Sequence, residues 1–90
     1  MSTRAADAVD DDRLTTAEYR ERLRELPPSA KLVAKVLEGK SPLSQGQLAE
    51  ESLLPDRTVR YALNRLEESG IVDSRYSFKD ARKQVYSLRT

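Results

Sequence analysis

The chain has 90 residues, 34% of them charged, a formal net charge of +1, and neither cysteine nor histidine. This length corresponds to one domain, and the lack of cysteine excludes disulfides and thiolate metal sites. The lack of histidine removes the commonest general base and the commonest nitrogen ligand, so we expect no catalytic residues, no metal and no cofactor.

Residues 1–13 are predicted to form a disordered acidic tail. Met1 and Val9 are their only aliphatic residues besides alanine, and a run of three aspartates begins at Asp10. Such a segment cannot bury enough apolar surface to offset the entropy cost of ordering. The aspartates could also be taken for a Mg²⁺ site, but a solvated acidic arm is the simpler interpretation.

Residues 14–26 are predicted to form a helix that Thr15 or Thr16 caps and the following prolines end. Its large apolar residues recur at positions i, i+4 and i+7, which makes a narrow stripe. Such a stripe suits packing against the domain or against a second copy of the chain. The candidate contacts of a homodimer are Tyr19, Leu23 and Leu26.

The next helix is predicted to begin near Pro28 and to end at Gly39, which is placed like a C-terminal cap. After it we expect a short extended link that turns Leu43 into the core. The apolar face of the helix is expected to contain Ala30, Leu32, Val33, Ala34, Val36 and Leu37.

A third helix is predicted to follow Ser44, because Ser44 and Gln47 have the spacing of a capping box. Leu48, Ala49 and Leu53 are expected to pack inward. A fourth helix should run from about Asp56, its candidate N-cap, to Ser69, with Gly70 as the stop. Its core stripe is predicted to be Val59, Ala62, Leu63 and Leu66.

The outward side of this fourth helix carries hydrogen-bonding side chains first and acidic ones at its end. Arginine matches O6 and N7 of guanine, and asparagine matches N6 and N7 of adenine. This polarity suits a helix whose first half enters a major groove, although any exposed helix face must be polar and arginine is a good helix former. The candidate DNA contacts are Arg57, Thr58, Arg60, Tyr61, Asn64 and Arg65.

The third and fourth helices are joined by a tight turn, as in a helix-turn-helix unit whose second helix reads DNA. The start of the third helix offers unbonded backbone N–H groups, which suit a phosphate. We therefore add Ser44, Gln45 and Gln47 to the candidate contacts.

Residues 71–77 and 84–88 are predicted to be strands, joined by a polar hairpin loop. A basic ribbon beside a recognition helix can touch the DNA backbone or enter the minor groove. Exposed turns are often charged, but the helix and the hairpin in this order are much less expected by chance. The candidate contacts of the hairpin are Arg75, Lys79, Asp80, Arg82 and Lys83.

Lysines and arginines outnumber acidic residues only in the C-terminal part of the chain. Residues 1–26 hold five arginines and seven acidic residues, whereas residues 27–90 hold eleven lysines and arginines and eight acidic residues. Apolar runs reach only three or four residues, against the roughly 20 that span a bilayer. Because residues 1–13 also lack the apolar core of a secretory signal, we expect a cytoplasmic protein without membrane contact.

Three stretches resemble the winged helix-turn-helix domains of MarR-like transcriptional regulators, particularly small archaeal ones. They are residues 43–49, residues 54–72 with the ending Leu-Glu-Glu-Ser-Gly-Ile-Val, and residues 80–88 with Asp-Ala-Arg-Lys and Tyr-Ser-Leu. The resemblance covers about two-thirds of the chain, from about residue 28 to 88. It implies that Arg82 enters the minor groove while Asp80 holds Arg82 or the neighbouring backbone in place.

The resemblance also implies dimerisation, since such regulators usually dimerise through long helices at both ends. A domain of this size buries only about 60% of its unfolded surface, so a partner would help to stabilise it. Only Arg89 and Thr90 follow Leu88. We therefore expect no C-terminal dimerisation helix, which leaves the first helix for that task, and we assign no small-molecule effector.

The sequence predicts a mainly α fold with a small antiparallel β-hairpin, a winged helix-turn-helix in residues 27–90. We expect a sequence-specific, double-stranded DNA-binding transcriptional regulator that is nucleoid-associated. The alternative is a winged-helix protein-interaction module within a transcription or replication assembly, which would bind without a steep salt dependence. An enzyme is the least favoured class, because a Ser, Tyr or Lys nucleophile would have no histidine to activate it.

Overall fold

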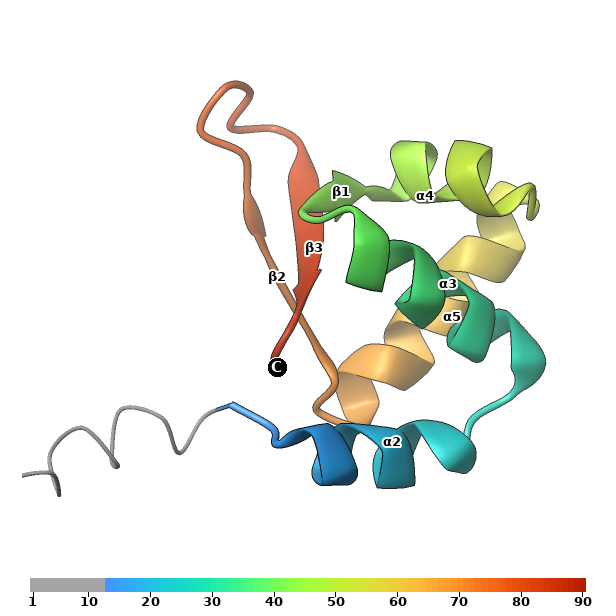
Figure 1. The fold of residues 1–90 in the computed structure, drawn as a ribbon. Coiled ribbons are helices and arrows are strands. Elements are labelled where there is room, and N and C mark those ends of the chain that lie inside the picture. The colour runs from blue at the N-terminus through green and yellow to red at the C-terminus, as the bar shows by residue number, and fades with distance from the viewer. Residues whose placement is uncertain (1–12) are drawn as a thin grey trace, which may run out of the picture.

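The computed structural model describes residues 13–90, so the predicted tail lies outside this part of the chain except for Arg13. Helices pack together on one side, and a β-hairpin projects beyond them at the upper left of Figure 1. The predicted mainly α fold with a small antiparallel sheet is confirmed. The elements are α2 (Thr16–Arg24), α3 (Pro28–Gly39), β1 (Leu43–Ser44), α4 (Gln45–Ser52), α5 (Asp56–Glu68), β2 (Val72–Tyr76) and β3 (Gln84–Leu88).

The sheet contains one strand more than the sequence predicted. Its order is β1-β3-β2, and both pairings are antiparallel. The extra strand, β1, pairs Leu43 with Tyr86 of β3. Two residues are too few to show the alternation that marks a strand, so its sequence indicated only an extended link. Leu43 is 9% exposed, which confirms that it turns into the core.

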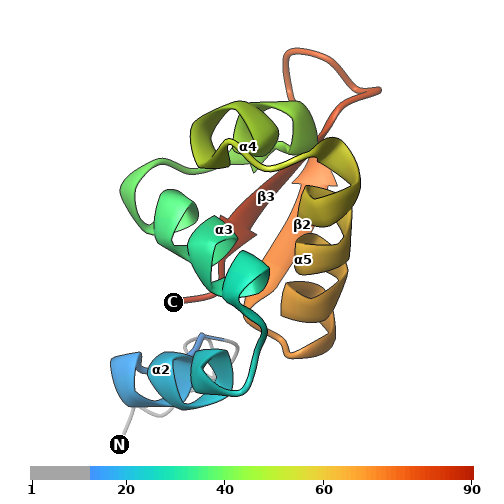
Figure 2. The same ribbon diagram turned by 90° about the vertical axis from the view of Figure 1, so that its right-hand side faces the viewer.

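Helices α3 and α5 pack against each other at the centre of the core, and Figure 2 shows β2 and β3 in the space between these two helices. The predicted stripe of α5 is confirmed, because Val59, Ala62, Leu63 and Leu66 are at most 2% exposed. On α3 the prediction for Leu32 is wrong, since this side chain is 41% exposed. The buried residues of α3 repeat at i, i+3, i+4 and i+7 from Ala30, and Leu32 falls outside that stripe.

Helix α2 closes the core at the end opposite the tip of the hairpin (Figure 1). Tyr19, Leu23 and Leu26 are between 5% and 8% exposed within this single chain. Of the two predicted roles of this stripe, packing against the domain is the one seen in the single chain, and the homodimer contact stays a prediction. Two polar contacts hold α2: the Tyr19 hydroxyl donates to Glu38 at 2.5 Å, and Arg22 donates to the carbonyl of Ser69 at 3.0 Å.

The helices begin where the sequence predicted, near residues 16, 28, 45 and 56, but one of the predicted caps is not formed. Thr15 and Ser44 both form the predicted side-chain caps, each as part of a capping box. The prediction that Asp56 caps α5 is wrong, because extended Pro55 occupies the cap position and Asp56 is the first helical residue. Its carboxylate still lies where the helix dipole favours negative charge.

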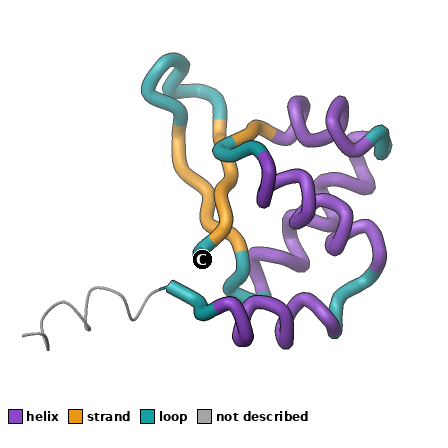
Figure 3. Tube along the Cα trace, in the orientation of Figure 1, coloured by secondary structure: helices purple, strands orange, loops and turns teal. Residues whose placement is uncertain are grey.

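The helix ends differ more from the sequence predictions. Gly39 is the last helical residue of α3 rather than a left-handed cap, and the chain leaves through Lys40 in extended conformation. Leu53 does not pack inward: it is 89% exposed and adopts a left-handed conformation with φ 63° at the end of α4. A left-handed residue lets the chain turn sharply from α4 into α5, the loop at the right of Figure 3, and the Leu53 side chain lies in solvent there. Gly70 ends α5 as predicted, with φ 72°.

We expect Leu63→Ala to lower the free energy of unfolding by about 2–5 kcal/mol, because the truncation leaves a cavity between α3 and α5. Thermal or urea unfolding followed by circular dichroism measures this loss. Leu32→Ala, on the exposed side of α3, is the matched control and should change stability by less than about 0.5 kcal/mol. Equal effects of the two substitutions would contradict the assigned core.

The docking of α2 should make stability depend on alkaline pH. Burial, together with the hydrogen bond and the charge of Glu38, raises the pKa of Tyr19 far above its ordinary value of 10.0. As the pH rises through the ordinary pKa of 10.0, Tyr19 loses its proton in the unfolded chain but keeps it in the folded chain. The free energy of unfolding therefore falls as the pH rises.

We expect Tyr19→Phe to cost about 1 kcal/mol at neutral pH through loss of the hydrogen bond. The variant should also lose less stability than the parent chain between about pH 9 and about pH 11. Urea unfolding across this range measures both effects, with Tyr76→Phe, at an exposed hydroxyl, as the control. A parallel decline of parent and Tyr19→Phe would show that Tyr19 does not contribute.

Candidate nucleic-acid interface

The outward side of α5 is a continuous polar surface, which we call the reading face and define as Arg57, Arg60, Tyr61 and Asn64. All four residues are exposed, and Tyr61 is 48% exposed. They alternate with the buried stripe of the same helix, so packing of α5 in the core fixes the direction in which they point. The structure thus brings together the main group of predicted contacts.

The other two predicted contacts of α5 are less available. Thr58 is only half-exposed. Arg65 folds back along the helix: it donates to the Tyr61 hydroxyl at 3.0 Å, its guanidinium lies 5.9 Å from the Tyr61 ring centre, and it lies 3.8 Å from Glu68. This contact holds the Tyr61 ring against the helix, so Arg65 orients a member of the reading face.

The start of α4 lies beside α5, but its polar side chains are already engaged in hydrogen bonds within the chain. Ser44 is 8% exposed and its hydroxyl accepts from the backbone of Gln47, while the Gln47 side chain accepts from the backbone of Ser44. The side chain of Gln45 donates to the carbonyl of Asp56 at 3.4 Å and links the starts of α4 and α5. The remaining donors toward a ligand are therefore the backbone N–H groups of Gln45 and Gly46, because that of Gln47 already donates to Ser44.

We call the hairpin formed by β2, the loop of residues 77–83 and β3 the wing. Asp80 organises its loop: one carboxylate oxygen accepts from the backbone of Arg82 at 3.0 Å and lies 3.5 Å from its side chain. The carbonyl of Asp80 also accepts from the backbone of Lys83 at 2.9 Å. The Arg82 side chain is 94% exposed. Asp80 thus holds both Arg82 and the adjoining backbone, the geometry that the family resemblance implies.

A groove of about 450 Å³ joins the wing to the start of α4. It brings together two groups of residues that are about 40 positions apart in the sequence. Gly46, Glu50 and Gln84, which were not among the predicted contacts, lie there too. The groove is lined by Ser44, Gln45, Gly46, Gln47, Glu50, Arg82, Lys83, Gln84 and Tyr86.

The basic side chains of this surface are largely unpaired. The side chains of five of these residues form no hydrogen bond or ion pair with any other residue in the range 13–90. By contrast Lys35, on α3, pairs with Glu38 at 3.5 Å, and Lys40 pairs with Glu51 at 3.0 Å. The unpaired cations are Arg57 and Arg60 of the reading face and Arg75, Lys79 and Lys83 of the wing.

Tyr86 connects the reading face to the sheet. Burial raises the pKa of its hydroxyl, the charge of Glu67 raises it further, and Arg60 opposes both. The positive charge of Arg60, on the reading face, thus acts on a residue of β3. At neutral pH the Tyr86 hydroxyl is protonated and can act as a hydrogen-bond donor.

Two exposed aromatic residues of the wing were missed by sequence reasoning. Tyr76, at the end of β2, is 62% exposed, and Phe78, in the loop, is fully exposed at 102%. The only signal for Phe78 was the presence of an aromatic residue within an otherwise polar loop.

Between residues 13 and 90, no group of three or more acidic residues could hold a metal ion. No helix in the same range has the length and apolar character needed to cross a membrane.

This fold and surface define a winged helix-turn-helix protein. Residues 35–73, from the second half of α3 to the first part of β2, match a sequence family described as winged helix-turn-helix DNA-binding. The match covers the helix-turn-helix and the reading face, and it spans somewhat less than half of the chain. No curated protein matches the sequence.

Solved structures share this fold. A MarR family transcription regulator superposes with a TM-score of 0.68 at 20% identity, over 82% of this chain and 50% of its own. The PcaV transcriptional regulator from Streptomyces coelicolor gives 0.67 at 23% identity, over 72% of this chain and 48% of its own. A probable transcriptional regulator from Pseudomonas aeruginosa gives 0.70 at 21% identity, over 94% and 61%.

The present chain thus spans between 48% and 61% of the length of these regulators. At such identities the likeness shows the winged helix fold, which agrees with the resemblance to MarR-like regulators. The narrower expectation of a small archaeal type stays a prediction.

Proposed function

We propose that this chain is a sequence-specific, double-stranded DNA-binding transcriptional regulator with no catalytic role. The first half of α5 would enter the major groove, and residues 75–84 of the wing would lie on the adjacent backbone or in the minor groove. The observation that carries the proposal is the reading face, whose arginines and asparagine are exposed and make no side-chain hydrogen bond or ion pair within residues 13–90.

Each part of the surface has a separate task in this proposal. Arg57, Arg60 and Asn64 would contact base edges, since their donors suit guanine and adenine in the major groove. The backbone N–H groups at the start of α4 would hold a phosphate. Lys79, Arg82 and Lys83 would neutralise phosphates or enter the minor groove.

The comparisons support this proposal. The matched family is described as DNA-binding, and the structures of like fold are transcription regulators. A regulator of this kind would act in the cytoplasm at the nucleoid. Recognition of a palindrome would need two copies of the chain, and the spacing of its half-sites would report the dimer geometry.

The direct experiment is selection from a randomised duplex pool, with sequencing, at two salt concentrations. An enriched motif together with a steep salt dependence of affinity is the expected result. Weak binding without enrichment, from a folded sample, would overturn the proposal and favour a protein-interaction winged helix.

Arg60→Ala and Asn64→Ala should each weaken binding to the selected site by about 1–3 kcal/mol and relax base preference at one position. The physical reason is the loss of hydrogen bonds to a base edge. Titration of selected and random duplexes by fluorescence anisotropy measures the effect. Arg20→Ala, which removes an exposed arginine from α2, is the control and should leave both affinities unchanged. Equal weakening on selected and random duplexes would exclude base reading at these positions.

Lys83→Ala should weaken all duplexes alike and lower the slope of log affinity against log salt by about 1, because it removes one phosphate contact. Titrations at four or more salt concentrations measure the slope. Lys31→Ala, on α3 and away from the wing, is the charge-matched control. A slope equal to that of the parent chain would mean that Lys83 touches no phosphate.

A further inference from the structure

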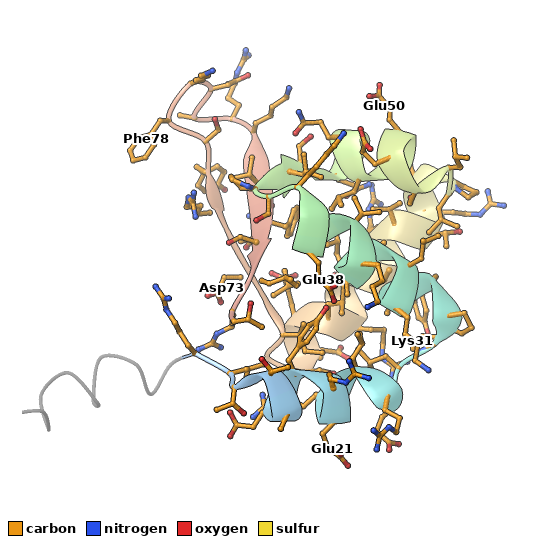
Figure 4. The ribbon with its side chains drawn as sticks, in the orientation of Figure 1. Glu21, Lys31, Glu38, Glu50, Asp73 and Phe78 are labelled. Atoms are coloured by element: carbon orange, nitrogen blue, oxygen red, sulfur yellow. The ribbon has the colours of Figure 1, made fainter. Side chains whose placement is uncertain are left out.

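Phe78 is the single phenylalanine of the chain, and the fold makes no use of its ring. The side chain is 102% exposed, and Figure 4 shows it at the end of the wing, pointing away from the helices. Removing a phenyl ring from water is favourable, but in the isolated chain this ring stays in contact with water. A partner that covers the ring would therefore gain it on binding.

The charges around Phe78 indicate the chemistry of that partner. The following loop residues include Lys79, Arg82 and Lys83, all exposed, whereas the one carboxylate, Asp80, is engaged by Arg82. The partner must thus present negative charge on its outside and an apolar, ring-sized site within reach. Duplex DNA has this chemistry, since phosphates line its grooves and the faces of the base pairs lie between them.

The position of the ring agrees with such a partner. The wing tip and α4 lie at the same end of the molecule, opposite α2 (Figure 1). The loop is held in shape by Asp80 and by the hydrogen bond from the backbone of Ser77 to the carbonyl of Lys83 at 2.8 Å. Because the ring points away from the helices, it would reach a part of the duplex beyond the segment that α5 covers.

We propose that Phe78 is an apolar wedge that enters the minor groove and stacks on a base step while the neighbouring cations hold the phosphates. Inserted side chains of this kind unstack a step and kink the duplex. This inference rests on the proposed function, and it adds a contact that depends on the deformability of the DNA rather than on hydrogen bonds to base edges.

The chain contains no tryptophan, so Phe78→Trp introduces a single indole at the wing tip. Addition of the selected duplex should quench its emission strongly, because the indole stacks on bases. Leu32→Trp places an indole on the exposed side of α3 and should show no quenching. Phe78→Ala should weaken binding about tenfold without changing the salt slope, and it should reduce the bend of a duplex labelled at both ends for energy transfer.

The outcomes separate this proposal from the one on which it rests. If Phe78→Ala binds and bends the duplex like the parent chain, and the Phe78→Trp emission is unchanged, the wedge is overturned while DNA binding stands. If that emission shifts to the blue with phosphatidylglycerol vesicles and not with duplex, the wing tip binds a lipid surface instead and the wedge is overturned. If the parent chain binds no duplex at either salt concentration, the proposed function itself fails.

Discussion

Helix α5 supplies the centre of the core on one side and carries the reading face on the other, and the rest of the structure depends on this arrangement. The helix packs against α3, α4 and β2, and its buried stripe is at most 2% exposed. Side chains of Arg57, Arg60 and Asn64 leave the same backbone on the opposite side. Contacts to base edges need a geometry held within a fraction of an ångström, and a helix locked along its whole length supplies that rigidity.

Both ends of α5 are held by side chains from other helices. Gln45 of α4 donates to the carbonyl of Asp56 at the start, and Arg22 of α2 donates to the carbonyl of Ser69 at the end. Gly70 makes the second contact feasible, because a Cβ there would lie 2.8 Å from the Arg22 guanidinium and its φ is 72°. Helix α2 therefore supports the end of α5, and its apolar stripe is buried against the rest of the same chain.

Local sequence patterns predicted the parts of the fold that depend on local physics. The 3.6-residue period identified the core face of α5, the capping-box spacing identified the start of α4, and the glycine at position 70 identified the end of α5. The errors arose where a neighbour distant in sequence decides the outcome. Leu53 is apolar yet exposed because the turn needs a left-handed residue there, and β1 exists only because β3 is available to pair with it.

The candidate site divides in the same way. Residue type and helical phase were enough to place the reading face on one surface of α5. They could not show that the Arg65 side chain packs on Tyr61, because this contact depends on side-chain rotamers. For the same reason they could not show that the Ser44 hydroxyl already accepts a hydrogen bond from the backbone of Gln47. They also gave no reason to single out Phe78, because an aromatic residue in a loop is usually covered by something, and only the structure shows that nothing in residues 13–90 covers it.

The net charge of +1 hides the electrostatic organisation of the molecule. Exposed ion pairs such as Lys35 with Glu38 and Lys40 with Glu51 add little stability, so their main effect is to cancel positive charge away from the reading face. The unpaired cations of α5 and the wing keep their full field. A long polyanion would thus be attracted to one end of the molecule, the end where α5 and the wing present their donors, and orientation would begin before any base is touched.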